Sequence, residues 1–198
     1  MAIKIDPPEY LFPYKILTSK DSDFDSYKDD MIEWMRVYSL DNKTYERSNF
    51  GGYQSPDKFY LEESFAPYLN RITEQIVSTT EEYISDEQSE IPSGDLKLCN
   101  MWFNFNYENS YNVTHVHPGS VLAGVLWIQC PEGCNPITFE DPNTFARSLI
   151  TKDCHENFTP EPGVMMIFPS YLPHRVDINR TNTTRISLSF NLDRTYGD

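Results

Sequence analysis

The spacing of hydrophobic positions changes near residue 95 and divides the chain into two parts. In the first part, apolar residues recur at helical spacing, which predicts helices over residues 22–39 and 58–86. The apolar stripe of the second helix consists of Phe65, Tyr68, Leu69, Ile72 and Ile76. Pro67 lies near the start of that stripe, and we expect it to kink the helix or to set its true N-terminus. A short extended segment over residues 9–17 is expected before both helices.

After residue 95 the hydrophobic positions form short β-rich runs between turn signals such as Glu132-Gly133 and Pro162-Gly163. The runs cover residues 97–107, 111–117, 121–130, 136–141, 156–161, 164–169, 174–179 and 184–192. Eight such runs predict a mainly β (α+β) fold, a double-stranded β-helix of the jelly-roll, cupin-like kind. The N-terminal helices are expected to pack on one sheet. We expect a single domain over residues 1–198, with 1–95 supporting a β core over 96–198.

Composition and charge narrow the function classes. The formal net charge of −14 would repel a phosphate backbone, so no nucleic-acid partner is expected. No apolar stretch reaches the ~18 residues of a membrane span, and no secretory leader is present, which predicts a cytoplasmic protein that has no membrane partner.

We expect the four cysteines to be free thiols. A zinc site on Cys130, Cys134, Cys154 and His155 is the less favoured alternative, and His155 is otherwise expected on the surface or in a loop.

Three of the four histidines fall where a metal site in a jelly roll would need them. His115 and His117 are two residues apart, so on a strand their imidazoles share one face. The second and seventh strands of a jelly roll are neighbours, which would bring His174 beside this pair. Imidazole suits iron, copper, nickel and zinc. Arg185 and Ser187 would share a face of the last strand, and a guanidinium beside a hydroxyl suits a carboxylate.

Short motifs in a fixed order connect most of the chain, including its helical part, to a known family. They are Ser48-Asn49-x-Gly51-Gly52-x-Gln54-Ser55, Trp102-x-Asn104, His115-x-His117-Pro118, Ile137-Thr138-Phe139-Glu140-Asp141-Pro142, Gly163-x4-Phe168-Pro169-Ser170-x3-His174 and Arg185-Ile186-Ser187. In this order the chain resembles the non-haem Fe(II), 2-oxoglutarate-dependent oxygenases. It is most similar to a little-characterised branch of them that is common in marine bacterial and phage genomes.

The resemblance implies Fe(II) and 2-oxoglutarate as cofactors, and a reaction that converts 2-oxoglutarate to succinate while a substrate C–H bond is hydroxylated. In that superfamily the iron is held by a His-x-Asp/Glu…His triad. Arg185 and Ser187 match the positions that bind the distal carboxylate of 2-oxoglutarate. Asn104 is expected to line the same pocket, together with Trp102 and Tyr111 on adjacent strands, and the alternative for all three is packing in the β core. Trp127 is expected to be core packing.

This chain departs from the family pattern because His117 stands where the triad carboxylate is expected. His115, His117 and His174 could form a three-histidine site, which is the completion we expect. Alternatively, Asp141 could supply a carboxylate from the strand face that it would share with Ile137 and Phe139. In a third option His117 is the leading histidine and Gly119 the vacant position. Loss of the carboxylate makes the centre one charge more positive, which favours an anionic co-substrate and keeps zinc or nickel open as occupants.

The predicted function is therefore a 2-oxoglutarate-dependent hydroxylase that acts on a small molecule or a protein side chain. One alternative is a catalytically silent jelly-roll module, for example a virion or assembly component. The other is a three-histidine cupin-type dioxygenase that does not use 2-oxoglutarate, and such an enzyme would have no need for Arg185 as a carboxylate clamp. The sequence leaves the oligomeric state open, with a homodimer as one option.

Overall fold

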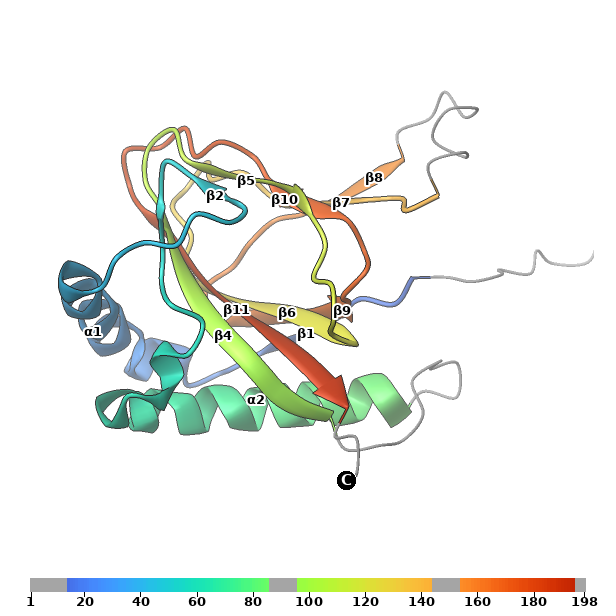
Figure 1. The fold of residues 1–198 in the computed structure, drawn as a ribbon, viewed down its shortest axis with the longest axis horizontal. Helices are drawn as coiled ribbons and strands as arrows, with labels where there is room; N and C mark the ends of the chain where they lie inside the picture. The colour runs from blue at the N-terminus through green and yellow to red at the C-terminus, as the bar shows by residue number, and fades with distance from the viewer. Residues whose placement is uncertain (1–13, 86–95, 144–153, 195–198) are drawn as a thin grey trace, which may run out of the picture.

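Two antiparallel sheets face each other in the computed structural model, which describes residues 14–85, 96–143 and 154–194 (Figure 1). Across the larger sheet the strands are β1 (Leu17–Lys20), β9 (Val164–Pro169), β6 (Leu122–Gln129), β11 (Arg185–Arg194), β4 (Leu96–Asn106) and β3 (Tyr53–Gln54). Across the smaller sheet they are β2 (Asn49–Phe50), β5 (Tyr111–His115), β10 (His174–Val176), β7 (Ile137–Glu140) and β8 (His155–Phe158). This is the predicted double-stranded β-helix, with the second and seventh predicted strands, β5 and β10, paired.

All eight strands predicted after residue 95 are present, and the errors lie at their ends and in the N-terminal part. β5 ends at His115, two residues earlier than predicted, and β10 ends at Val176. The extended segment predicted over residues 9–17 is a strand only from Leu17, and residues 9–13 lie outside the described ranges. β2 and β3 have two residues each, which is too short for a periodic signal.

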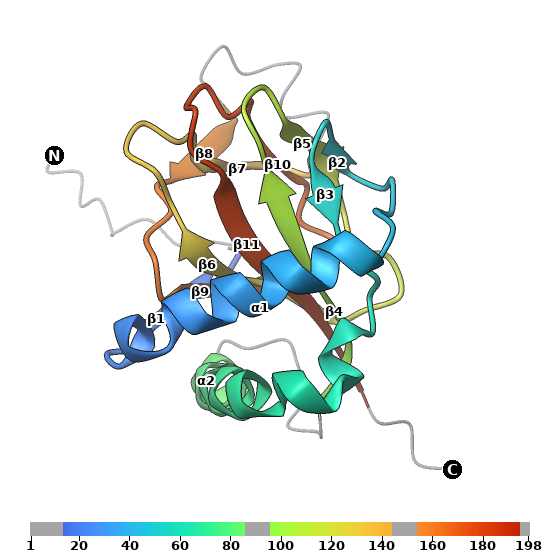
Figure 2. The same ribbon diagram turned by 90° about the vertical axis from the view of Figure 1, so that its left-hand side faces the viewer.

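Two helices cover the outer face of the larger sheet (Figure 2). α1 (Lys28–Asp41) and α2 (Ala66–Ser85) both begin later than predicted, because 3-10 turns occupy Phe24–Ser26, Phe59–Leu61 and Glu63–Phe65. Pro67 is the second residue of α2, where its missing N–H removes no intrahelical bond, so it sets the N-terminus and does not kink the helix. In the described part of the chain, neither these helices nor the short turns combine the length and apolarity needed to cross a bilayer.

Residues alternate between two different environments along the central strands of the larger sheet. On β11, Ile186, Leu188 and Phe190 join the large apolar core beneath the helices. Their neighbours Ser187 and Ser189 face the space between the sheets. A second apolar core, which includes Trp127, Phe139 and Phe168, fills part of that space. The space between the sheets therefore contains both an apolar core and a polar cavity, and both sheets contribute to each.

Candidate active site

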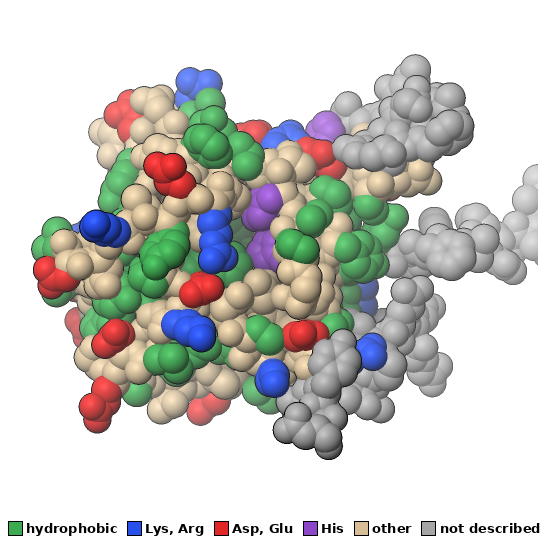
Figure 3. Space-filling model, in the orientation of Figure 1, with side chains coloured by type: hydrophobic (Ala, Val, Ile, Leu, Met, Phe, Trp, Pro, Cys, Tyr) green, Lys and Arg blue, Asp and Glu red, His purple; other side chains and the backbone are tan. Residues whose placement is uncertain are grey.

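Three histidines converge between the sheets, where the surface is hollowed and histidine side chains are visible (Figure 3). His115 at the end of β5 pairs directly with His174 at the start of β10. His117 lies beyond the end of β5, and its backbone N–H donates to the Ser170 carbonyl at 2.8 Å. The ring centroids are 4.4 to 5.1 Å apart, and one possible ligand atom from each histidine lies within 4.8 Å of the others. The structure thus brings together all three predicted metal ligands.

Hydrogen bonds fix the tautomer of each imidazole. The Nδ1 atoms of His115 and His174 donate to the carbonyls of Val113 and Leu172 at 2.8 and 2.9 Å. Nδ1 of His117 lies 2.6 Å from Oδ1 of Asn191. Because a backbone carbonyl can only accept, Nδ1 of His115 and of His174 carries the proton and Nε2 keeps its lone pair. With the Asn191 oxygen facing it, Nδ1 of His117 donates in the same way. Nε2 of His117 is buried and has no partner among the described residues. This arrangement is typical of imidazoles that bind a metal through Nε2.

Burial keeps the three imidazoles neutral at physiological pH. It lowers the pKa of His117 to about 4, although the bond to Asn191 opposes the shift and nearby His115 adds to it. It also lowers the pKa of His174 well below its usual value, and that of His115 below its usual value. Neutral imidazole is the form that binds metals. The cluster is therefore prepared for a cation without any proton having to leave.

The same burial predicts a pH-dependent stability for the metal-free protein. Between pH 6.5 and about 4 the unfolded His117 binds a proton that the folded one does not, so stability falls as pH falls through this window. From pH 7 to pH 5, His117 alone should remove about 2 kcal/mol from the free energy of unfolding. Urea unfolding at both pH values measures the loss. A His117→Gln variant should lose clearly less, and an equal loss would contradict this assignment.

Asp141, the alternative carboxylate ligand, lies away from the histidines. β7 ends at Glu140, so Asp141 is not part of the strand, and the alternation of side chains that predicted an inward direction does not apply to it. Its Oδ1 accepts the Asn143 backbone N–H at 2.8 Å, and it lines a different cleft together with Tyr14 and Leu172. Within residues 14–85, 96–143 and 154–194, no Asp or Glu belongs to a group with the three histidines.

Arg185 lies at the start of β11, on the inward side of the strand. It is 1% exposed, and its Nε and Nη1 atoms are buried without a partner among the described residues. Burial lowers the pKa of its guanidinium to about 10, which leaves it protonated at neutral pH, and the thiols of Cys130 and Cys134 lie near it. Leaving N–H donors of a buried cation unpaired is costly, and such donors therefore indicate an anion site. Asn191, the hydrogen-bond partner of His117, lies on the same side of the same strand.

The other predicted pocket residues divide into two groups. Asn104 and Ser187 are directly paired on β4 and β11, and both line a cavity between the sheets. Trp102 lines the same cavity, and its ring centroid is 5.5 Å from that of His117. Tyr111 is not in this lining and stacks on Phe50 at 5.5 Å between ring centroids.

Trp127 contributes a polar atom that the sequence analysis missed. It packs in the inter-sheet core as expected, but it also pairs with Ser187 across β6 and β11 and lines the cavity. Its indole N–H is buried without a partner among the described residues. The sequence carried no signal for this, because the pairing of β6 with β11 cannot be read from local periodicity. An unpaired N–H beside Ser187 is a further donor for an anion.

The space around these donors is small in this conformation. The cavity lined by Asn104, Trp127 and Ser187 has a volume of about 30 Å³, comparable to one water molecule. Arg185 does not line it. A larger anion can therefore reach the Arg185 guanidinium only if the lining side chains move apart. A second cleft of about 530 Å³ opens over His115 and His117 and has the size of an ordinary ligand pocket.

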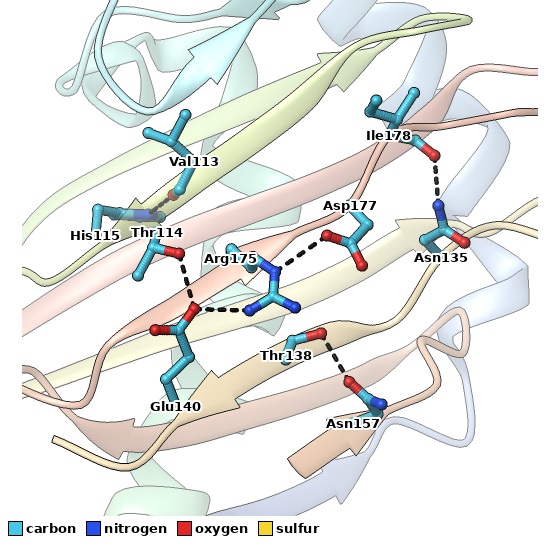
Figure 4. Close-up of polar contacts among 10 residues, drawn as sticks. All are labelled: Val113, Thr114, His115, Asn135, Thr138, Glu140, Asn157, Arg175, Asp177 and Ile178. Atoms are coloured by element: carbon cyan, nitrogen blue, oxygen red, sulfur yellow. Dashed lines mark hydrogen bonds and ion pairs between the residues drawn. The ribbon is translucent and has the colours of Figure 1, made fainter. Parts of the chain in front are cut away.

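Polar bonds on the outer face of the smaller sheet connect the strands that carry the histidines (Figure 4). Side chains alternate between the two faces of a strand, and the neighbours of the inward-facing residues therefore point outward. These neighbours are Thr114 on β5, Arg175 on β10 and Glu140 on β7. Oε1 of Glu140 accepts from Thr114 Oγ1 at 2.9 Å and from Arg175 Nη1 at 2.6 Å. This bridge spans the three strands and supports the registration of His115 against His174.

Comparisons with known proteins agree with this geometry. Residues 100–191 match a family model of 2OG-Fe(II) oxygenases. No curated protein matches the sequence. Among solved structures, HygX from Streptomyces hygroscopicus with nickel and 2-oxoglutarate bound is similar, with a TM-score of 0.62, 10% identity and coverage of 91% of this chain and 83% of that chain.

Two prolyl hydroxylases are also similar. The Trichoplax adhaerens enzyme in complex with a hypoxia inducible factor peptide has a TM-score of 0.66, 9% identity and coverage of 90% of this chain and 83% of that chain. A Pseudomonas putida prolyl-4-hydroxylase has a TM-score of 0.59, 13% identity and coverage of 91% and 93%. At these identities the likeness shows a shared fold, and the family match covers the strands from β4 to β11 that carry the histidines and Arg185.

Proposed function

We propose that this chain, whose residues 100–191 match the model of 2OG-Fe(II) oxygenases, is a 2-oxoglutarate-dependent hydroxylase with a three-histidine iron site. The proposal depends on one observation, namely that a candidate metal site and a candidate anion site lie in the same barrel. One is a set of neutral imidazoles with fixed tautomers and convergent nitrogens. The other is a buried arginine with unpaired donors.

The residues present fit Fe(II). His115, His117 and His174 would hold it through Nε2, since each Nδ1 is already used. Bound there, Fe(II) would supply the redox chemistry by which dioxygen oxidises 2-oxoglutarate to succinate and CO₂ and hydroxylates a C–H bond, with one oxygen atom going to each product. Because no carboxylate of the described residues joins the set, the protein leaves the full 2+ charge of the ion to attract anions.

The donor set also fits 2-oxoglutarate, which carries a carboxylate at each end. We assign the distal carboxylate to Arg185, with Ser187 and the Trp127 indole N–H as neighbouring donors. Charge-assisted bonds to a guanidinium are roughly twice as strong as neutral ones. Asn104 lies directly opposite Ser187 in the strand pairing, and its Oδ1 already accepts from Asn49 Nδ2 at 3.2 Å. Entry of the co-substrate requires the small cavity between these residues to widen.

The protein's own contribution is orientation and exclusion of water. Asn191 and the carbonyls of Val113 and Leu172 hold the imidazole rings in place. Phe168 packs against His174 with ring centroids 4.9 Å apart, and the ring of Trp102 lies 5.5 Å from that of His117. Each ring excludes water from the part of the imidazole that it covers, which strengthens the electrostatic interactions there.

A three-histidine dioxygenase that does not use 2-oxoglutarate is the second candidate, because the ligand set contains no carboxylate in the described structure. The unpaired donors of Arg185 favour the first candidate, since such an enzyme has no distal carboxylate to bind. For the substrate we propose a small molecule or a protein side chain. The formal net charge of −14 disfavours nucleic acid.

Anaerobic titration separates these functions. Fe(II) and 2-oxoglutarate together should give a weak visible charge-transfer band that neither gives alone, and oxygen should then convert 2-oxoglutarate to succinate. Metal binding without this band would support the second candidate. If the protein bound neither metal nor 2-oxoglutarate, both enzymatic functions would be wrong and a silent jelly-roll module would remain.

A further inference from the structure

The open cleft over the histidines has a chemical character of its own. Its floor contains His115, His117 and Trp102, and its rim is formed by the loop after β5 and by the segment that carries Arg47. At about 530 Å³ it could hold a small molecule beside the histidines, whereas the inner cavity could not. A ligand in this cleft would therefore lie where a substrate must lie if the proposed function holds.

Charge distinguishes this cleft from two other clefts of similar size. Its lining contains Arg47 and no Asp or Glu. The clefts of similar size near β1 and β8 are lined by several acidic residues, among them Asp21 and Glu156. Arg47 is half exposed and makes only a loose ion pair, 3.5 Å from Asp57. On a chain with a net charge of −14, a large cleft that offers a cation and no acid is suited to an anion.

Two residues that line the cleft each carry a buried amide oxygen without a hydrogen-bond partner among the described residues. Gln54 on β3 is 2% exposed, and its Oε1 is buried without a hydrogen bond among the described residues. Oδ1 of Asn100 on β4 is in the same state, and Asn100 pairs with Asn191, which holds His117. Buried polar atoms are normally satisfied, so unpaired amide oxygens on two residues that line a cleft indicate N–H donors on a ligand.

We propose that this cleft binds a small carboxylic acid that carries N–H donors, as a free amino acid does. Arg47 pairs with its carboxylate, and Gln54 and Asn100 accept from its nitrogen. That this ligand is the substrate rests on the proposed function, but the binding itself does not, because none of the three residues is a metal ligand.

Calorimetry on the metal-free full-length protein tests the binding directly. The probes are the free L-amino acids, their carboxamides and their deamino acids. At least one amino acid should bind about tenfold or more tightly than both its carboxamide and its deamino acid, since each lacks one charge-assisted hydrogen bond. Arg47→Gln should remove the preference over the carboxamide, and Gln54→Leu should reduce the preference over the deamino acid. Arg36→Gln, on the exposed side of α1, should keep both preferences.

The outcomes separate this inference from the proposed function. If no amino acid binds, or if amino acids and carboxamides bind equally, the cleft assignment is wrong even when Fe(II) and 2-oxoglutarate give their band. If the preferences are present and respond to the variants, the cleft assignment stands. Absence of the band would then count against the oxygenase alone.

Discussion

His174→Ala should abolish stoichiometric binding of Fe(II), with an affinity loss of more than about 100-fold. His174 is 4% exposed and contacts both other histidines, with ring centroids 4.4 and 5.1 Å away. Two remaining nitrogens cannot complete a three-ligand site. Metal content after anaerobic loading, with Zn²⁺ or Ni²⁺ as redox-inert substitutes, measures the effect.

Two companion variants show whether the loss is specific to a ligand. Asp141→Ala should keep the wild-type metal content, because this carboxylate bonds to the Asn143 backbone and lies in another cleft. His117→Asp should also retain metal, since it creates the family's carboxylate triad and Asn191 can rotate its amide to donate to the new acid. A large loss in Asp141→Ala would instead promote Asp141 to a ligand.

Arg185→Ala should weaken binding of 2-oxoglutarate by about 100-fold or more while metal binding is kept. The guanidinium is buried, remains charged and has two unpaired nitrogens, so an anion would gain charge-assisted bonds with little side-chain ordering. Titration of the metal-loaded protein with 2-oxoglutarate, followed through the charge-transfer band, gives the affinity. Retained metal binding in the same sample shows that the variant is folded.

Geometry can be separated from charge at this position. Arg185→Lys keeps the charge but loses the planar fork, so it should recover only part of the affinity. Arg180→Ala, a nearby exposed arginine in the turn before β11, serves as the matched control and should bind 2-oxoglutarate as the wild type does. Equal affinity in Arg185→Ala and wild type would remove Arg185 from the co-substrate site.

Local periodicity predicted what depends on a single strand. The jelly-roll strand order placed His174 beside His115, as the structure has them. The two-residue spacing predicted that His117 joins them, and it does, although β5 ends at His115 and a backbone bond to Ser170 holds His117 in place of strand pairing. Asp141 shows the limit of the same reasoning. The alternation places it inward only if the strand continues, and β7 ends one residue before it.

Features that depend on several elements could not be predicted in this way. The unpaired N–H of Trp127 becomes visible only once β6 is paired with β11. The cleft over the histidines combines Arg47 from a loop, Gln54 from a two-residue strand and Asn100 from β4. The pairing of β3 with β4 and the path of the loop bring these residues together. The late starts of both helices reflect 3-10 turns, in which the apolar residues Phe24 and Phe59 are buried much as they would be in a helix.

The single strand β11 limits how this sequence can change in length. Arg185 and Asn191 lie on the same side of it, one toward the anion site and the other on His117. Deleting or inserting one residue between them would turn one of the two side chains to the outer face, into the core beneath the helices. Related genes should therefore tolerate length differences in the turn at residues 180–184. Between the positions of Arg185 and Asn191 they should tolerate only insertions or deletions of an even number of residues, which keep both side chains on the same face.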